Sequence, residues 1–401
     1  MFGTLAPPAG AHGVGAGVFG FLTTYDARAL RLVSRLCCAD VAAARWLDAE
    51  TYITGSLAAW RACFPGARAA NVVVRADLKD ADFAHLAGVT KVNMEQCTAI
   101  TDAGLAHLTG IRTLGMCGCT GITDAGLAHL TGIHTLDMRD CPAITDAGLA
   151  HLLGIRTLNM ERCSGVTDAG LAHLRGIHTL DMRSCTGITG AGLVHLRGIH
   201  TLKMWRCPGI TDAGIAHLSG IHTLDMRDCP AITDAGLAHF CGIRTLNMER
   251  CTGITDAGLE HLRGILSLSM HGCTGITDAG LAHLRGIHTL DMGQCNGITD
   301  AGLAHLTGIH TLYMDGCNGI TDAGLAHLAG IHTLDMSGCA EITADGIEHL
   351  HGISALTMNF CRRSTFNAAN RLCEDVEGED LREDGNEDEE DEEDEEEDEE
   401  G

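Results

Sequence analysis

The chain has 401 residues and a formal net charge of −26, with 51 glycines but only 3% aromatic residues. So few large side chains argue against two or three conventionally packed domains. There is no run of about 18 apolar residues, and no basic segment precedes an apolar one at the N-terminus. The sequence therefore predicts neither a membrane span nor a secretory signal, and it favours a soluble protein of the cytoplasm or the nucleus.

Residues 1–66 do not repeat, and residues 14–46 have the apolar spacing of two short amphipathic helices. This stretch resembles the later half of an F-box, L-x-x-x-D-x-x-x-L-x-x-V-[SC]-[RK], which is matched by Leu22, Asp26, Leu30, Val33, Ser34 and Arg35, with Trp46 near the usual closing tryptophan. The resemblance implies a helical module that docks an adaptor protein, and the apolar residues expected at this contact are Phe19, Leu22, Leu30 and Val33. The alternative is that residues 14–46 only cover the open end of the repeats that follow.

From Val89 the sequence repeats every 22 residues as I-x-x-L-x-M-x-x-C-x-x-I-T-D-A-G-L-A-H-L-x-G. Apolar and polar residues alternate in the first half, which predicts a short strand, and "TDAGLAHL" has the spacing of a helical turn. Thr123 or Asp124 can cap the helix start, and Gly132 stands where a left-handed residue would close it. Each unit is predicted to be a strand, a turn and a short helix.

This pattern resembles the leucine-rich repeat in its cysteine-containing form, over residues 67–361. The resemblance implies an α/β solenoid, a parallel sheet arc with short helices, opened by a degraded unit at residues 67–88 and followed by a C-terminal cap within residues 362–401. An F-box before such repeats resembles the substrate receptors of cullin-RING (SCF-type) ubiquitin ligases. That resemblance implies an adaptor and cullin complex as partners, and a protein substrate held by the repeats.

Two columns of reactive residue types follow the repeat. Thirteen of the 19 cysteines recur every 22 residues from Cys97 to Cys361, and parallel thiols in an intracellular protein are expected to be buried and reduced. A straight ladder does not converge on a tetrahedron, so no metal site is predicted. Histidine columns beginning at His107 and His134 are expected to be structural, with at most a modest loss of stability below about pH 6.

Cys117 and His271 break the repeat but stand alone in the sequence. Because no nucleophile and base are paired and no phosphate-binding loop occurs, we expect neither an enzyme nor a cofactor.

The variable strand positions are the candidate binding surface. Counted from the isoleucine that opens each unit, the fifth, seventh and eighth residues are expected on the concave face of the solenoid. The residues predicted to contact a partner are Arg139, Asp140, Glu161, Arg162, Arg183, Lys203, Trp205, Arg206, Arg227, Asp228, Glu249 and Arg250. Between residues 133 and 264 these positions hold seven cations and seven anions, so a nucleic acid is not expected and a protein is.

Trp205 is the predicted anchor of that partner, the alternative being that its ring only rests on the aliphatic stems of its neighbours. We expect the chain to act as one copy within a larger complex.

Residues 374–401 contain 21 acidic residues and one base, and the stretch from Glu383 to Gly401 is predicted to be disordered because its charges repel one another. The alternative to a ligase subunit is a protein-interaction scaffold, or a chaperone whose acidic tail binds basic proteins such as histones.

Overall fold

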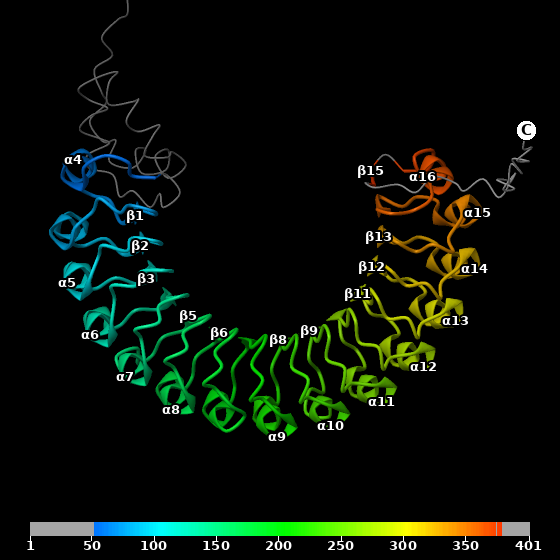
Figure 1. Ribbon diagram of the computed structural model, residues 1–401, viewed down its shortest axis with the longest axis horizontal. Coiled ribbons are helices and arrows are strands. Elements are labelled where there is room, and N and C mark those ends of the chain that lie inside the picture. The colour runs from blue at the N-terminus through cyan, green and yellow to red at the C-terminus, as the bar shows by residue number, and fades with distance from the viewer. Residues whose placement is uncertain (1–51, 374, 379–401) are drawn as a thin grey trace, which may run out of the picture. The chain divides into compact units, whose positions relative to one another are not determined.

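The computed structural model describes residues 52–373 and 375–378, in two compact units that meet after Ile265. Both units repeat the same element: a three-residue strand, a loop, and a single helical turn on the opposite side (Figure 1). The F-box-like residues Phe19, Leu22, Leu30 and Val33 and the acidic stretch beyond Gly378 lie outside the described residues. Within the described residues, no helix has the length and apolar character that a membrane crossing requires.

Within the described residues the first unit contains nine strands, and from β1 to β9 neighbouring strands are paired in parallel in chain order. They are β1 (Ala69–Asn71), β2 (Lys91–Asn93), β3 (Thr113–Gly115), β4 (Thr135–Asp137), β5 (Thr157–Asn159), β6 (Thr179–Asp181), β7 (Thr201–Lys203), β8 (Thr223–Asp225) and β9 (Thr245–Asn247). The register is one repeat, so that Thr135 lies beside Thr157.

The helices of this unit lie away from the strands. The α-helices are α4 (Leu57–Cys63), α5 (Asp102–Leu105), α6 (Asp124–Leu127), α7 (Asp146–Leu149), α8 (Asp168–Leu171), α9 (Asp212–Ile215), α10 (Asp234–Leu237) and α11 (Asp256–Leu259). The 3-10 helices are η2 (Asp80–Leu86), η3 (Ala106–Leu108), η4 (Ala128–Leu130), η5 (Ala172–Leu174), η6 (Gly192–Leu196), η7 (Ala216–Leu218) and η8 (Glu260–Leu262).

The second unit continues the same pattern. Its strands are β10 (Ser267–Ser269), β11 (Thr289–Asp291), β12 (Thr311–Tyr313), β13 (Thr333–Asp335), β14 (Ala355–Thr357) and β15 (Val376–Glu377). Its helices are α12 (Asp278–Leu281), η9 (Ala282–Leu284), α13 (Asp300–Leu303), η10 (Ala304–Leu306), α14 (Asp322–Leu325), η11 (Ala326–Leu328), α15 (Ala344–Ile347), η12 (Glu348–Leu350) and α16 (Arg363–Ala369).

The core of each repeat is made by the invariant apolar letters. In the repeat that begins at Ile133, the side chains of Leu136, Met138, Cys141 and Ile144 are at most 1% exposed. One repeat offers these side chains only a single layer of neighbours, so consecutive repeats bury one another. The predicted parallel solenoid is therefore confirmed, and its strands and helices begin where the 22-residue pattern places them.

Each helix start is closed by two residues from successive repeats. Thr123, and not Asp124, is the N-cap of α6, because its hydroxyl accepts a bond from the Ala125 amide at 3.3 Å. The Asp124 carboxylate instead accepts from the amide and the hydroxyl of Thr145, at 2.8 and 2.6 Å, in the next repeat. Gly132 has the predicted left-handed backbone, with φ +79°. The aspartate thus joins neighbouring repeats instead of capping its own helix.

The cysteine column is buried, and its thiols also join repeats. From Cys97 to Cys251 each thiol donates to the carbonyl oxygen of the residue 25 positions earlier, as Cys119 does to Met94 at 3.1 Å. Burial raises the pKa of Cys119 to about 12, so these thiols stay protonated at neutral pH. This agrees with buried cysteines that serve packing.

Both units are closed by segments that do not repeat. Residues 52–66, which the sequence groups with the N-terminal module, pack on the first repeat: Ile53 bonds Asn71 through its amide, and Arg61 donates to the carbonyl oxygens of His85 and Ala87. At the other end, β15 adds to β14 at the start of the acidic stretch, before the residues that are predicted to be disordered. The unpaired backbone groups of an edge strand account for this pairing.

The aspartate ladder is interrupted once in the first unit, at Gly190, which replaces the usual aspartate. The Gly190 amide donates to the Gly209 carbonyl oxygen at 3.0 Å, and the turn that follows is the 3-10 helix η6. Thr211, one repeat later, makes no side-chain cap bond. The carboxylate therefore helps to hold the threonine of the next repeat in its capping position.

We expect Thr233→Val to lower the free energy of unfolding by about 1–2 kcal/mol, because Thr233 both caps α10 and donates to Asp212. The matched change Thr211→Val should cost less than about 0.5 kcal/mol, since that hydroxyl makes neither bond. Urea unfolding followed by circular dichroism measures both. Equal losses at the two sites would contradict the stabilising role of the ladder.

Candidate functional site

The twelve predicted contact residues all belong to the first unit, at or just after its strands. The buried sixth residue of each repeat, such as Met138, points into the core, while its neighbours Asp137 and Arg139 point out on the strand side and are half-buried. Within this unit the helices lie on the other side of the strands (Figure 1). The outward-pointing residues between positions 137 and 250 thus form one continuous surface, which we call the strand face.

Arginines at the seventh position are paired with aspartates of their own repeat. Arg139, Arg183 and Arg227 lie 2.9, 2.8 and 2.8 Å from Asp137, Asp181 and Asp225, respectively. Arg183 also meets Glu161 of the preceding repeat at 2.8 Å. These hydrogen bonds raise the pKa of the Arg183 and Arg227 guanidinium groups. The charge of this row is therefore neutralised within the protein, which the sequence did not reveal.

The eighth position has a different backbone. Here φ is positive, +53° at Asp140, +58° at Arg162, +54° at Arg206, +49° at Asp228 and +55° at Arg250. A left-handed residue with a Cβ is strained by roughly 1 kcal/mol or more, and such strain is concentrated at functional sites. In the second unit the same column contains Gly272, Gly316 and Gly338, which relieve it, while Gln294 and Phe360 keep the strained conformation.

The arginines at this strained column are also more exposed than those of the seventh position. Arg162 lies 3.7 Å from Asp140, and Arg206 lies 3.5 Å from Asp228, with about 60% of each arginine side chain exposed. Arg250 is exposed too. They are therefore available to a partner, in contrast to the arginines of the seventh position.

Trp205 lies on the strand face as predicted, but it is held there by its neighbours. Its Nε1 donates to the Asp228 carboxylate at 2.7 Å, and the guanidinium carbons of Arg206 and Arg227 lie 4.7 and 5.0 Å from the ring centre. Such cation–π contacts contribute about 0.5–1 kcal/mol each at exposed sites. The ring is half-buried: it rests on its neighbours, as the alternative expects, and part of its surface remains open. Exposed Lys203 lies beside it on β7.

The second unit carries aromatic residues on the same side that the sequence reasoning did not select. Tyr313, at the fifth position, is 39% exposed, and Phe360, at the eighth, is 50% exposed. The sequence did contain a signal for these two residues, because each aromatic side chain stands where other repeats carry a small or polar residue.

The expectation that His271 stands alone is wrong. Its Nδ1 lies 3.8 Å from Asp291 and 3.7 Å from Asp315, residues of the next two repeats. Burial raises the pKa of the Asp315 carboxyl; His271 opposes the rise, while Asp291 adds to it.

The second histidine column forms stacks. His200 lies between His178 and His222 with ring centres 4.6 and 4.3 Å apart, and a similar stack is made by His288, His310 and His332. Loss of hydration and the flanking imidazoles lower the pKa of His200. A lowered pKa means that the folded state favours the neutral ring. Folding is therefore destabilised as the pH falls below the pKa of an ordinary histidine, because the unfolded chain then binds the proton more readily. The direction is the one predicted.

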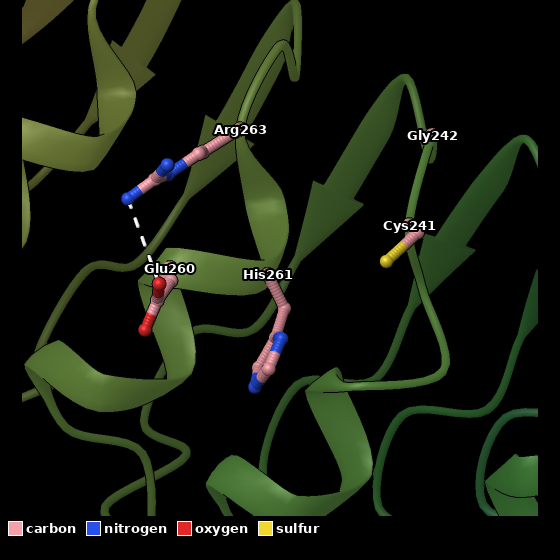
Figure 2. Close-up of a pocket in the computed structure, with 5 residues that line it drawn as sticks. All are labelled: Cys241, Gly242, Glu260, His261 and Arg263. Atoms are coloured by element: carbon pink, nitrogen blue, oxygen red, sulfur yellow. Dashed lines mark ion pairs between the residues drawn. The ribbon is translucent and has the colours of Figure 1, made fainter.

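The hollow in Figure 2 is a feature of the repeat and not a separate site. It is lined by Cys241, Gly242, Glu260, His261 and Arg263, with Arg263 3.6 Å from Glu260. An equivalent hollow three repeats earlier is lined by Arg175, Gly176, Val194, His195 and Arg197. The Cys241 thiol donates to the Ala238 carbonyl oxygen at 3.9 Å, and the hydrogen bond of a nucleophile to its base is not seen between Cys241 and His261.

Comparison with known proteins establishes the fold alone. No protein-family model and no curated protein matches the sequence. A chain of the Rad7–Elc1 complex from yeast is similar, with a TM-score of 0.51, 15% identity, and coverage of 66% of this chain and 81% of that one. An internalin (inlF) from Listeria monocytogenes has a TM-score of 0.56 and 21% identity, with coverage of 75% of this chain and 88% of the internalin chain. TLR13, from its complex with ssRNA13, has a TM-score of 0.57 and 13% identity. The match covers 79% of this chain but only 50% of the TLR13 chain. The fold is that of a leucine-rich-repeat solenoid, which is typical of interaction scaffolds.

Replacing Arg250 with glycine should raise the free energy of unfolding by about 1 kcal/mol, because glycine relieves the positive φ. Arg244→Gly, at an exposed arginine without a positive φ, should instead lower it by up to about 1 kcal/mol. Both are measured by urea unfolding. A loss of stability at Arg250 equal to that at Arg244 would show that the eighth position stores no strain.

Proposed function

We propose that this protein is the substrate-recognition subunit of a cullin-RING ubiquitin ligase. In this proposal the strand face binds the protein to be ubiquitinated, and the F-box-like residues Phe19, Leu22, Leu30 and Val33 bind the adaptor. The observation that carries the binding role is the eighth position, where five charged side chains are kept in a left-handed backbone although glycine occurs there in other repeats. A side chain kept at a cost in stability has a use outside folding.

The chemistry of the strand face favours a folded protein surface over a polyanion. Its arginines at the seventh position are already neutralised by aspartates, and its formal charge at the variable positions is balanced. A phosphate backbone needs an excess of cations. The half-buried indole of Trp205, with exposed Lys203 and Arg206 beside it, instead suits an apolar side chain surrounded by acidic groups.

The likeness to a chain of the Rad7–Elc1 complex supports a role in a protein assembly. The F-box resemblance, which carries the ligase part of the proposal, rests on residues 14–46 alone.

Leu30→Asp combined with Val33→Asp should remove the adaptor and the cullin from material co-purified with the tagged full chain, because charges at a docking contact must be desolvated. Arg31→Asp, at a position that the F-box pattern leaves open, is the matched control and should retain both. Mass spectrometry of the purified complexes measures this. Histones recovered without adaptor or cullin from every variant would favour the acidic-tail chaperone instead.

Trp205→Ala should weaken binding of the substrate protein at least tenfold, since aromatic residues at the centre of an interface dominate its affinity. Tyr313→Ala removes an exposed aromatic residue from the strand side of the second unit and should leave the affinity unchanged. Calorimetric titration with the recovered substrate measures affinity, and thermal unfolding measures stability. Unchanged affinity with a lower melting temperature would make Trp205 a structural residue only.

A further inference from the structure

Three potential metal ligands converge in the second unit, and none of them belongs to the strand face of residues 137–250. His271 and Asp315 occupy the seventh position of two repeats, and Asp291 occupies the fifth position of the repeat between them. The His271 Nδ1 lies 3.8 Å from Asp291 Oδ1 and 3.7 Å from Asp315 Oδ1, and the three ligand atoms all lie within 4.8 Å of one another. All three residues are half-buried.

Gly293 is what lets these side chains meet. It occupies the seventh position of the middle repeat, directly between His271 and Asp315, where other repeats carry arginine, glutamate or tryptophan. A Cβ placed on Gly293 would lie 2.2 Å from Asp315 Oδ1 and 2.5 Å from His271 Nδ1. The space that a side chain fills elsewhere is therefore the space on which the imidazole and the carboxylates converge.

The same glycine leaves Asp291 without the cation that its counterparts have. Asp137, Asp181 and Asp225 each pair with the arginine two residues later, whereas Asp291 is followed there by Gly293. Within residues 266–361 the only lysine or arginine is Arg285, which lies on the helix side, 3.5 Å from His305.

The Asp291 carboxylate is also fixed in place. It accepts from the Ser269 hydroxyl at 2.9 Å and from the Gly293 amide at 3.2 Å. Hydrogen bonds of this kind orient a carboxylate that serves as a metal ligand. The site thus combines a positioned carboxylate, a second carboxylate and an imidazole, and residues 266–361 supply no arginine or lysine on the strand side to neutralise them.

We propose that His271, Asp291 and Asp315 bind a divalent transition-metal ion, for which Zn²⁺ is the first candidate. One imidazole and two carboxylates suit such an ion, whose bonds to nitrogen and oxygen are about 2.0–2.2 Å long. Ligands around it are then roughly 3.3–3.6 Å apart, so separations of 3.7 and 3.8 Å need only small side-chain rotations. This proposal is independent of the ubiquitin-ligase function.

The test is a Co²⁺ titration of the full chain, purified through a tag without histidines and stripped with EDTA. Excess Mg²⁺ occupies weak carboxylate sites, including those of the acidic C-terminal stretch. We expect one equivalent of Co²⁺ to produce visible absorption bands that Zn²⁺ abolishes by competition. His271→Ala and Asp315→Asn should each weaken binding at least tenfold. Gly293→Arg, which restores the arginine of other repeats, should do the same.

Two control variants separate this site from other sources of binding. Asp225→Asn changes the residue equivalent to Asp291 in a repeat that has its arginine, and it should bind Co²⁺ as the unchanged protein does. His310→Gln breaks a histidine stack and should also have no effect. Circular dichroism confirms that each variant is folded. The proposal is overturned if one-equivalent binding is absent, if it survives in His271→Ala and Asp315→Asn, or if only His310→Gln removes it.

Discussion

Stacking of one repeat on the next is the constraint on which everything else in this structure depends. A repeat alone leaves one side of its core open, and its helix start lacks part of its support. Neighbouring repeats supply both: apolar side chains pack across the open side, and the aspartate of the preceding repeat accepts from the amide and hydroxyl of the capping threonine, as Asp124 does from Thr145. Gly190 is the exception, because there the turn becomes a 3-10 helix and Thr211 has no cap bond. The aspartate therefore shapes the helical turn as well as joining one repeat to the next.

The stacking residues are nearly constant from repeat to repeat, whereas the three outward strand positions vary widely. Those positions lie side by side at a spacing of about 4.8 Å, so a side chain there always has a neighbour from the next repeat. In the first unit this produces ion pairs within and between repeats, such as Arg183 with both Asp181 and Glu161. A row of charges that looks available in the sequence is partly neutralised by the protein itself, and the exposed cations that remain are Lys203 and the arginines of the strained eighth position.

The sequence predicted the parts of the structure that depend on local chemistry. The strand–turn–helix unit, the left-handed Gly132 and the burial of the cysteines follow from the 22-residue pattern, since each is set within one repeat. Whether Thr123 or Asp124 capped the helix could not be decided, because the bond that settles it runs to the next repeat. The pairing of Arg227 with Trp205 and the meeting of His271 with Asp315 depend on distances across strands, which a linear pattern does not contain.

Glycine substitution changes this surface as much as the addition of a functional side chain does. At the eighth position glycine removes both strain and a contact residue, which leaves the second unit with fewer charged groups to offer a protein partner. At the seventh position, Gly293 stands where other repeats carry a larger side chain such as arginine. Its missing side chain leaves Asp291 without an arginine partner, and it also leaves space for the side chains on either side. In a solenoid whose neighbouring side chains always touch, deleting one residue brings its two neighbours into contact. A new site can therefore arise between repeats that were previously separated, with no change to the residues that stack.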